Sequence, residues 1–259
     1  MTLKGVNPMF IRNESFGEFL RKYKVVSALI FINLVLYMWT DWFGFLGGDE
    51  IYWLGIGNNV YVAFGEYWRL VTPIFLHAGL MHVAFNSFSL FLFGPALERM
   101  LGRGTFLMVY LGTGIFANVV YYFLGDPRAW HLGASGAVYG LFGIYLYMVL
   151  VRKDLINSQN AQLITVIIVI GVIMTFINPN INIIAHIFGL IAGALLAPLT
   201  LSKVTRESYY QNVHDQDDVG FDPDRWKKRE RFRQAKWVYI AGGFGLMVLF
   251  FYVVDLIFF

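Results

Sequence analysis

The chain has 259 residues, of which 58% are hydrophobic and 14% are charged, and its formal net charge is +3. Soluble domains carry about 25% charged residues, so this chain has too little charge to cover the outside of a water-soluble core. Cysteine is absent, which excludes a disulfide framework and a thiolate metal site. The composition therefore predicts a protein with much of its surface facing lipid.

Seven segments of the sequence are long and apolar enough to cross a membrane, which requires about 17–25 residues each. In chain order they are residues 25–43, 80–97, 105–124, 134–151, 162–178, 182–200 and 237–258. They predict an all-α fold, a polytopic membrane helix bundle. We expect four parts: an N-terminal segment at 1–24, a six-span core at 25–200, a linker at 201–236 and a seventh membrane helix at 237–259.

The basic residues lie almost entirely on one side of the predicted bundle. Only Arg69 and Arg128 fall in the connections after the first, third and fifth spans, and all the others fall on the opposite side. Positive charge marks the cytoplasmic side of a membrane protein. We therefore expect a cytoplasmic N-terminus, a cytoplasmic linker and a C-terminus on the outer, extracellular side.

Two connections are unusually long. Residues 44–79, on the outer side, are rich in tryptophan and tyrosine, which predicts an interfacial segment at the level of the lipid headgroups. Residues 201–236 contain an acidic half followed by a basic half. This pattern favours a solvated linker whose basic run contacts headgroups, with a regulatory or partner-binding role as the alternative. The basic run adjoins a span and lacks a recognition motif, so we expect no nucleic-acid partner.

Polar residues inside spans are costly and mark candidate functional sites. The sequence LGASGAVYG places Ser135 between Gly133 and Gly136, at the start of the fourth predicted span. Free N–H groups at a helix N-terminus stabilise an oxyanion, so the pattern favours a nucleophilic serine. Gly136 and Gly140 are four residues apart and fit a helix-packing seam equally well. This motif alone leaves both interpretations open.

His186 lies about one turn into the sixth predicted span, and Gly189 and Gly193 follow it. These glycines form a face that a neighbouring helix can approach closely. The fourth and sixth spans both run inward, so Ser135 and His186 are predicted at similar depth near the outer surface. A serine within hydrogen-bond reach of a histidine is an activated nucleophile. A structural histidine, or a metal or proton site, is the alternative.

His77, His82 and Asn86 lie around the outer end of the second predicted span. His82 and Asn86 are four residues apart and share one helix face. Their N–H donors fit an oxyanion-binding role together with the backbone N–H of Ser135. A zinc site is disfavoured, because the sequence has no H-E-x-x-H pattern and no acidic cluster in the spans.

Together these residues resemble the rhomboid family of intramembrane serine proteases over roughly residues 20–200. The motifs that carry the resemblance are Trp68-Arg69, His77 with Met81-His82 and Asn86, Gly94-x-x-x-Glu98-x-x-x-Gly102, Gly133-Ala134-Ser135-Gly136, and Ala185-His186-x-x-Gly189-x-x-x-Gly193. Their order and their positions on the predicted spans agree with the family's pattern. The seventh span is compatible with it, because the family has six-span and seven-span forms.

The resemblance implies specific roles for these side chains. Ser135 and His186 would form a catalytic dyad without an acidic third member. Asn86, His82 and the backbone amide of Ser135 would form the oxyanion hole, and Tyr139 would stack on His186. Glu98 and Arg99 would be structural hydrogen-bonding groups, and we expect the same of Asn118, which has no catalytic role in this interpretation.

The resemblance also implies single-span membrane proteins as substrates, cut near the outer face, with no cofactor and no metal. The fifth span, residues 162–178, is nearly all apolar and offers no catalytic candidate. By resemblance, it and the following loop would form the lateral gate for substrate. A compact chain without a recognisable targeting segment favours a bacterial plasma membrane.

Two other functions compete with a protease. A catalytically inactive rhomboid-like protein would bind or escort membrane clients, but such members lack the serine or the histidine, and both are present here. A channel or transporter would place polar groups at the middle of the membrane, often with paired repeats or broken helices. Here the polar groups gather toward one leaflet, which favours the protease.

Overall fold

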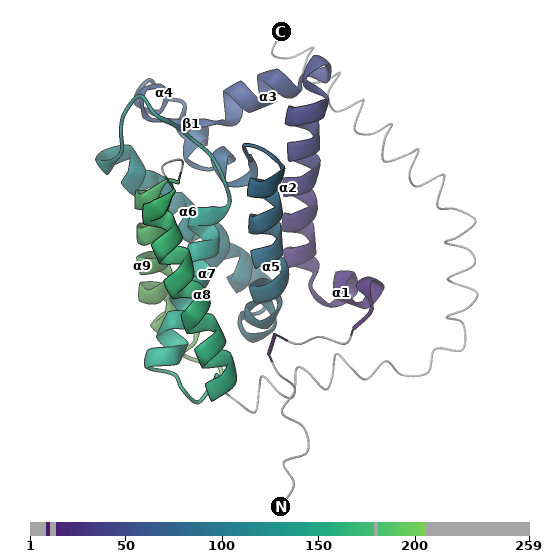
Figure 1. Cartoon of the computed structure of the whole chain (residues 1–259), viewed down its shortest axis with the longest axis vertical. Coiled ribbons are helices and arrows are strands. Elements are labelled where there is room, and N and C mark those ends of the chain that lie inside the picture. Colours follow the sequence, from purple (N-terminus) through teal and green to yellow (C-terminus); the bar gives the residue numbers. More distant parts are fainter. Residues whose placement is uncertain (1–8, 11–13, 179–180, 206–259) are drawn as a thin grey trace, which may run out of the picture. The chain divides into compact units, whose positions relative to one another are not determined.

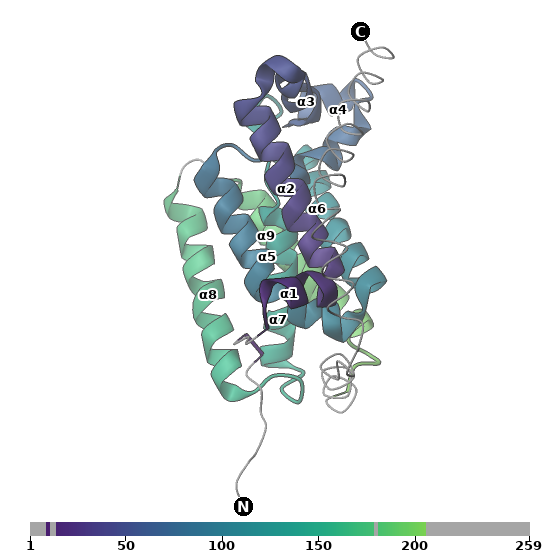
Figure 2. The ribbon, with the colours of Figure 1, turned by 90° about the vertical axis from the view of Figure 1, so that its right-hand side faces the viewer.

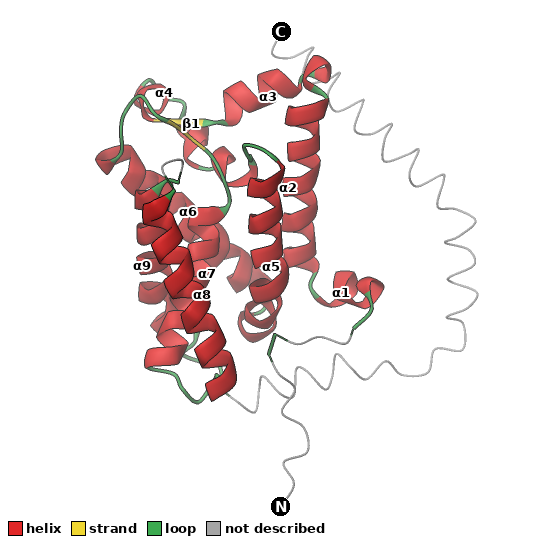
Figure 3. Ribbon diagram, viewed as in Figure 1, coloured by secondary structure: helices red, strands yellow, loops and turns green. Residues whose placement is uncertain are grey.

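The computed structural model describes residues 9–10, 14–178 and 181–205, and nearly all of its regular structure is helical (Figure 1, Figure 3). The helices are α1 (Phe16–Lys22), α2 (Lys24–Trp42), α3 (Gly48–Gly55), α4 (Asn59–Ala63), α5 (Leu80–Leu101), α6 (Arg103–Leu124), α7 (Ser135–Leu150), α8 (Ser158–Ile177) and α9 (Ile183–Thr200). Three 3-10 helices are also present: η1 (Gly44–Leu46), η2 (Tyr67–Leu70) and η3 (Thr72–Phe75). The all-α prediction is confirmed. The predicted seventh span and most of the predicted linker lie outside the described residues.

Helices occur at all six span positions that fall within the described residues. Helices α2, α5, α6, α8 and α9 are long and apolar enough to cross a membrane. Helix α7 has 16 residues, and it begins and ends one residue inside the predicted span. At 1.5 Å per residue it spans about 24 Å, less than the roughly 30 Å of a bilayer's hydrocarbon core.

Helix α7 lies at the centre of the bundle. It contacts α5, α6, α8 and α9, and 11 of its 16 residues are buried. Helices α2 and α5 pack against each other, and α8 lies at the edge (Figure 2). A helix surrounded by protein needs no full lipid-facing length.

Glycines bring the backbones of α7 and α9 into direct contact. A Cβ atom added to Gly189 would collide with the carbonyl oxygen of Gly136, and one added to Gly193 would collide with that of Gly140. The contacts repeat every four residues, because that spacing keeps side chains on one helix face. The predicted small-residue seam is confirmed, and it joins the two helices that carry Ser135 and His186.

The outer segment at residues 44–79 folds into short helices that are linked by hydrogen bonds from Arg69. This arginine is 3% exposed, and its Nη1 donates to the carbonyl oxygens of Trp53 at 2.8 Å and Ile56 at 2.6 Å. Its Nε donates to Glu66 at 2.6 Å. A pair of two-residue strands, β1 (Gly57–Asn58) and β2 (Trp130–His131), joins this segment to the loop before α7. Its interfacial position remains a prediction.

Glu98 on α5 caps the first turn of α2. Its carboxylate accepts hydrogen bonds from the backbone N–H groups of Val25 at 3.1 Å and Val26 at 2.9 Å, and the side chain is 3% exposed. Tyr23, at the N-cap of α2, makes no side-chain capping bond to this turn. The expected structural role of Glu98 is therefore confirmed.

Replacing Glu98 by alanine is expected to destabilise the protein by about 1–3 kcal/mol, because two buried backbone donors lose their acceptor. Thermal unfolding in detergent measures the change, with the exposed Glu50→Ala as the matched control. Glu50 makes only a surface contribution, below about 1 kcal/mol, in the first turn of α3. Equal unfolding temperatures for the two variants would contradict the capping role.

Candidate active site

Ser135 is the first residue of α7, and its neighbour Gly133 has a conformation that favours glycine. Gly133 has φ = +129°, and a Cβ atom there would lie 2.6 Å from Nε2 of His82 and 3.7 Å from Oγ of Ser135. The backbone N–H of Gly133 donates to the carbonyl oxygen of Pro73 at 2.8 Å. The absent side chain thus lets His82 approach the serine, while the backbone of the loop is held in place.

His186 is the fourth residue of α9 and is 7% exposed. The helix begins with the side-chain oxygen of Asn182 accepting from the backbone N–H of Ala185 at 2.9 Å. The imidazole stacks on the Tyr139 ring, with centroids 4.1 Å apart and an interplanar angle of 20°. Tyr139 lies one turn after Ser135, so Ser135 and His186 belong to the same end of the α7–α9 pair. The stacking predicted for Tyr139 is confirmed.

His77 and His82 form a pair beside the same loop. Their ring centroids are 5.1 Å apart at 74°, and Nε2 of His77 accepts from the backbone N–H of Ala134 at 3.4 Å. Nδ1 of His82 accepts from the backbone N–H of Ala78 at 3.4 Å. A neutral imidazole that accepts through Nδ1 carries its proton on Nε2, and this is the nitrogen that faces Gly133.

Asn86 is buried one turn below His82. Its Nδ2 donates to the carbonyl oxygen of His82 at 3.0 Å, which uses one of the two amide hydrogens. The structure therefore brings His82 and Gly133 together at Ser135, and it places Asn86 further along the same α5 face.

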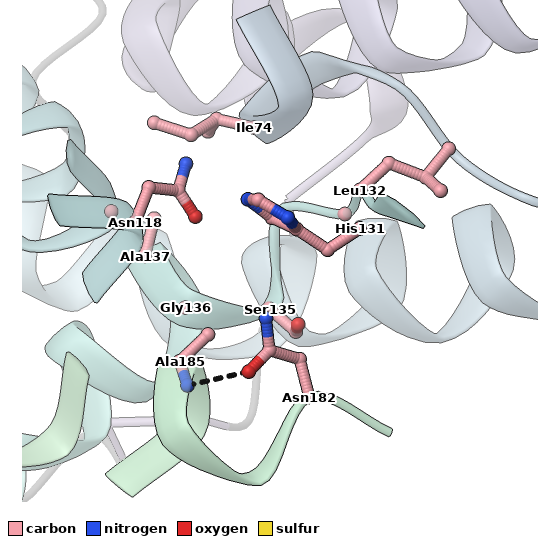
Figure 4. Close-up of a pocket in the computed structure, with 11 residues that line it drawn as sticks. Ile74, Asn118, His131, Leu132, Ser135, Gly136, Ala137, Asn182 and Ala185 are labelled. Carbon is pink, nitrogen blue, oxygen red and sulfur yellow. Dashed lines mark hydrogen bonds between the residues drawn. The ribbon is translucent and has the colours of Figure 1, made fainter. Parts of the chain in front are cut away.

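A small cavity lies beside Ser135 (Figure 4). Its lining includes Asn118, His131, Ser135 and Asn182. Nδ2 of Asn118 donates to the carbonyl oxygen of Leu70 at 3.0 Å, which confirms the structural hydrogen bond expected for this residue. Across the described ranges, no group of three or more His, Cys, Asp or Glu side chains could hold a metal ion.

His131 is a site residue that sequence reasoning missed. It is 8% exposed, and neither ring nitrogen has a hydrogen-bond partner among the described residues. Its ring packs on Tyr121 at a centroid distance of 4.4 Å. The only available signal was its position four residues before Ser135, because a lone histidine in a two-residue strand has no periodic pattern.

Burial lowers the pKa of His131 from 6.5 to about 4. The unfolded chain therefore binds this proton more readily, and stability that is complete above about pH 6.5 falls as the pH approaches 4, by up to about 3 kcal/mol. Glutamine stays neutral at every pH, so His131→Gln is expected to reduce the loss of stability at low pH. Thermal unfolding in detergent between about pH 4.5 and 7.5 measures the slope.

Part of the acid sensitivity is expected to remain in that variant. Burial and the neighbouring His82 lower the pKa of His77 to about 3, which gives a loss of the same sign. His131→Gln should therefore reduce the slope without abolishing it. A slope identical to that of the wild type would contradict the assignment to His131.

Thr175, on the fifth span, is a second site residue that sequence reasoning missed. Its Oγ1 lies 2.8 Å from Nδ1 of His186 and 2.9 Å from Oη of Tyr139. A polar side chain in an otherwise apolar span was the available signal. Its partner His186 lies 11 residues further on, on the next helix, α9. Sequence spacing does not predict a contact between two helices.

Comparison of the sequence with known proteins identifies a family. Residues 64–203 match the family model described as the Rhomboid domain. The putative rhomboid protease YdcA of Bacillus subtilis (strain 168) is 47% identical over 200 residues, which cover 76% of this chain and 99% of YdcA. Rhomboid protease GluP of the same organism is 42% identical over 144 residues, or 55% of this chain and 28% of GluP.

A third relative is more distant. Rhomboid protease AarA of Providencia stuartii is 29% identical over 219 residues, which cover 74% of this chain and 77% of AarA. The family match covers more than half of the chain, and the match to YdcA covers nearly the whole of that relative. The chain therefore belongs to the rhomboid family of intramembrane proteases.

Proposed function

We propose that the protein is a serine endopeptidase that cuts transmembrane segments of single-span membrane proteins near the outer face. Ser135 is the nucleophile and His186 is its general base. The observation that carries this proposal is the stacking of His186 on Tyr139, one helical turn from Ser135. The α7–α9 glycine contacts support it, because they hold the two helices in direct backbone contact.

The chemistry proceeds in two steps. Oγ of Ser135 attacks the scissile carbonyl while Nε2 of His186 takes the hydroxyl proton, and the same proton then passes to the departing amine. Water then attacks the acyl-enzyme while the same imidazole takes a proton from it, and this proton passes to Oγ of Ser135 as the acid product leaves. No cofactor and no metal are required for these steps.

The oxyanion is stabilised by three donors in this proposal: Nε2–H of His82, the free amide hydrogen of Asn86 and the backbone N–H of Ser135. The hydrogen bond from Ala78 to Nδ1 of His82 supports the first assignment, because it leaves the proton on Nε2. Pre-oriented donors of this kind are worth about 100- to 1000-fold each in turnover.

The short α7 supports a site below the membrane surface. Its inner end is followed by Arg152 and Asp154, an ion pair of 2.7 Å, and charged groups favour the membrane interface. With that end at the cytoplasmic surface, Ser135 lies about 6 Å inside the outer edge of the hydrocarbon core. We propose a cytoplasmic N-terminus in a bacterial plasma membrane, and the excess of basic residues on that side of the predicted bundle supports this orientation.

The proposal is tested with purified protein in liposomes and a fluorescent single-span reporter with a small residue near the outer end of its helix. We expect one cut close to that small residue, mapped by the masses of both products. If the reporter binds but stays intact, the protein would instead be an escort of membrane clients. Cleavage that persists in Ser135→Ala would also overturn the proposal.

A further inference from the structure

Thr175 is a buried polar residue near the C-terminal end of α8, between two exposed apolar residues. Its exposure is 0%, whereas the neighbouring Met174 is 48% exposed and Phe176 is 63% exposed. The buried residues of α8 share one helix face, and they are Asn160, Ile164, Ile168 and Thr175. The threonine hydroxyl therefore points into the bundle and not to lipid, where α8 lies against α7 and α9.

The Thr175 hydroxyl contacts three polar atoms. Oγ1 lies 2.8 Å from the carbonyl oxygen of Gly171, 2.9 Å from Oη of Tyr139 and 2.8 Å from Nδ1 of His186. A hydroxyl has one hydrogen to donate and two lone pairs to accept with. The carbonyl of Gly171 can only accept, so it takes the hydroxyl hydrogen. Tyr139 and His186 then donate to the two lone pairs.

This assignment fixes the tautomer of His186. All three contacts are hydrogen bonds only when the imidazole carries its proton on Nδ1, which leaves the lone pair on Nε2. The opposite assignment, with Thr175 donating to Nδ1, leaves the 2.8 Å contact with Gly171 without a hydrogen. The helical geometry therefore favours the tautomer that a general base requires.

Gly171, one turn before Thr175, leaves room for this arrangement. A Cβ atom at Gly171 would lie 2.9 Å from Oη of Tyr139. Any larger residue there would displace the Tyr139 hydroxyl from Thr175. Gly171 and Thr175 lie on one face of α8. Gly171 leaves room for the hydroxyl of Tyr139, and Thr175 contacts both Tyr139 and His186.

We propose that Thr175 is a positioning residue that holds His186 in the Nδ1–H tautomer and fixes the plane of its ring. The proposal rests on the proposed function, in which His186 is the base. In a triad protease a carboxylate performs this task. A neutral hydroxyl performs it without placing a charge inside the membrane, where a carboxylate would cost several kcal/mol.

The kinetic test compares three variants on the fluorescent single-span reporter in liposomes. Thr175→Val keeps the shape and loses the hydroxyl, and we expect kcat to fall about tenfold or more with KM within about twofold. Thr175→Ser keeps the hydroxyl and should stay within about threefold of wild type. Thr165→Val makes the same change at an exposed site on α8 and should have no effect. Equal kcat values for Thr175→Val and Thr165→Val would overturn the proposal.

The tautomer is measured directly by nitrogen-15 NMR of histidine-labelled protein in detergent, with the His186 signals assigned by their loss in His186→Asn. We expect Nδ1 protonated and Nε2 unprotonated in the wild type at about pH 8, and a mixture in Thr175→Val. If His186 in the wild type carries its proton on Nε2, the proposal is wrong, whether or not the Thr175 variant folds. The NMR measurement does not depend on catalysis. A failure of the proposed function would instead appear as a wild-type protein that leaves the reporter uncut.

Discussion

Ser135→Ala is expected to lose covalent labelling by a fluorophosphonate probe and to cut the single-span reporter at least about 1000-fold more slowly than wild type. The probe reacts with a serine hydroxyl only when a base removes its proton, and alanine has no hydroxyl to react. Losing the nucleophile of a serine protease removes most of its rate enhancement. Gel fluorescence of the labelled protein and product formation from the reporter measure the two effects.

The matched control is Ser202→Ala, which removes an exposed serine hydroxyl just after the far end of α9. It is expected to keep full labelling and cleavage. His186→Ala should lose labelling nearly as completely as Ser135→Ala, because an unassisted serine is a weak nucleophile. Full labelling of a folded His186→Ala protein would refute its role as the base.

Gly189→Ala is expected to lower cleavage at least about 100-fold and to lower the unfolding temperature. The new methyl group meets the carbonyl oxygen of Gly136, which is main chain and cannot rotate away. Helices α7 and α9 must then separate, and a shift of about 1 Å in a catalytic group can cost about 100-fold in rate. Overpacking of this kind costs about 1–3 kcal/mol in stability.

The same substitution at Gly112, on α6, provides the control. A Cβ atom there meets no atom within 4 Å, so the change tests glycine removal from a membrane helix without a collision. Gly112→Ala is expected to keep full activity and to gain up to about 1 kcal/mol, because alanine favours the helical state. If Gly189→Ala matched this control in activity and stability, close α7–α9 contact would not be required.

The span positions and the glycine seam could be predicted from sequence, because both follow from local patterns. Apolar runs of about 20 residues indicate spans, and glycines four apart indicate a close helix contact. The burial of α7 inside the bundle, in contrast to the largely exposed α8, could not be predicted. Hydropathy does not distinguish these two environments.

Contacts between distant residues account for the other differences. Glu98 caps α2 from another helix, and the strand pair joins residues 57–58 to residues 130–131. Two-residue strands carry no periodicity, so the sequence predicted only an interfacial segment at 44–79. Thr175 was missed for the same reason, since its role depends on how α8 faces His186 and not on any spacing. The roles of Ser135, His186, His82 and Asn86 remain predictions.

The most direct test of the central claim is peptide mass spectrometry of purified protein after reaction with a fluorophosphonate probe. The proposed mechanism predicts a single phosphonylated residue, Ser135, and no adduct in a folded His186→Ala protein. An adduct on a different residue, or an unmodified Ser135 in protein that cleaves the reporter, would contradict it.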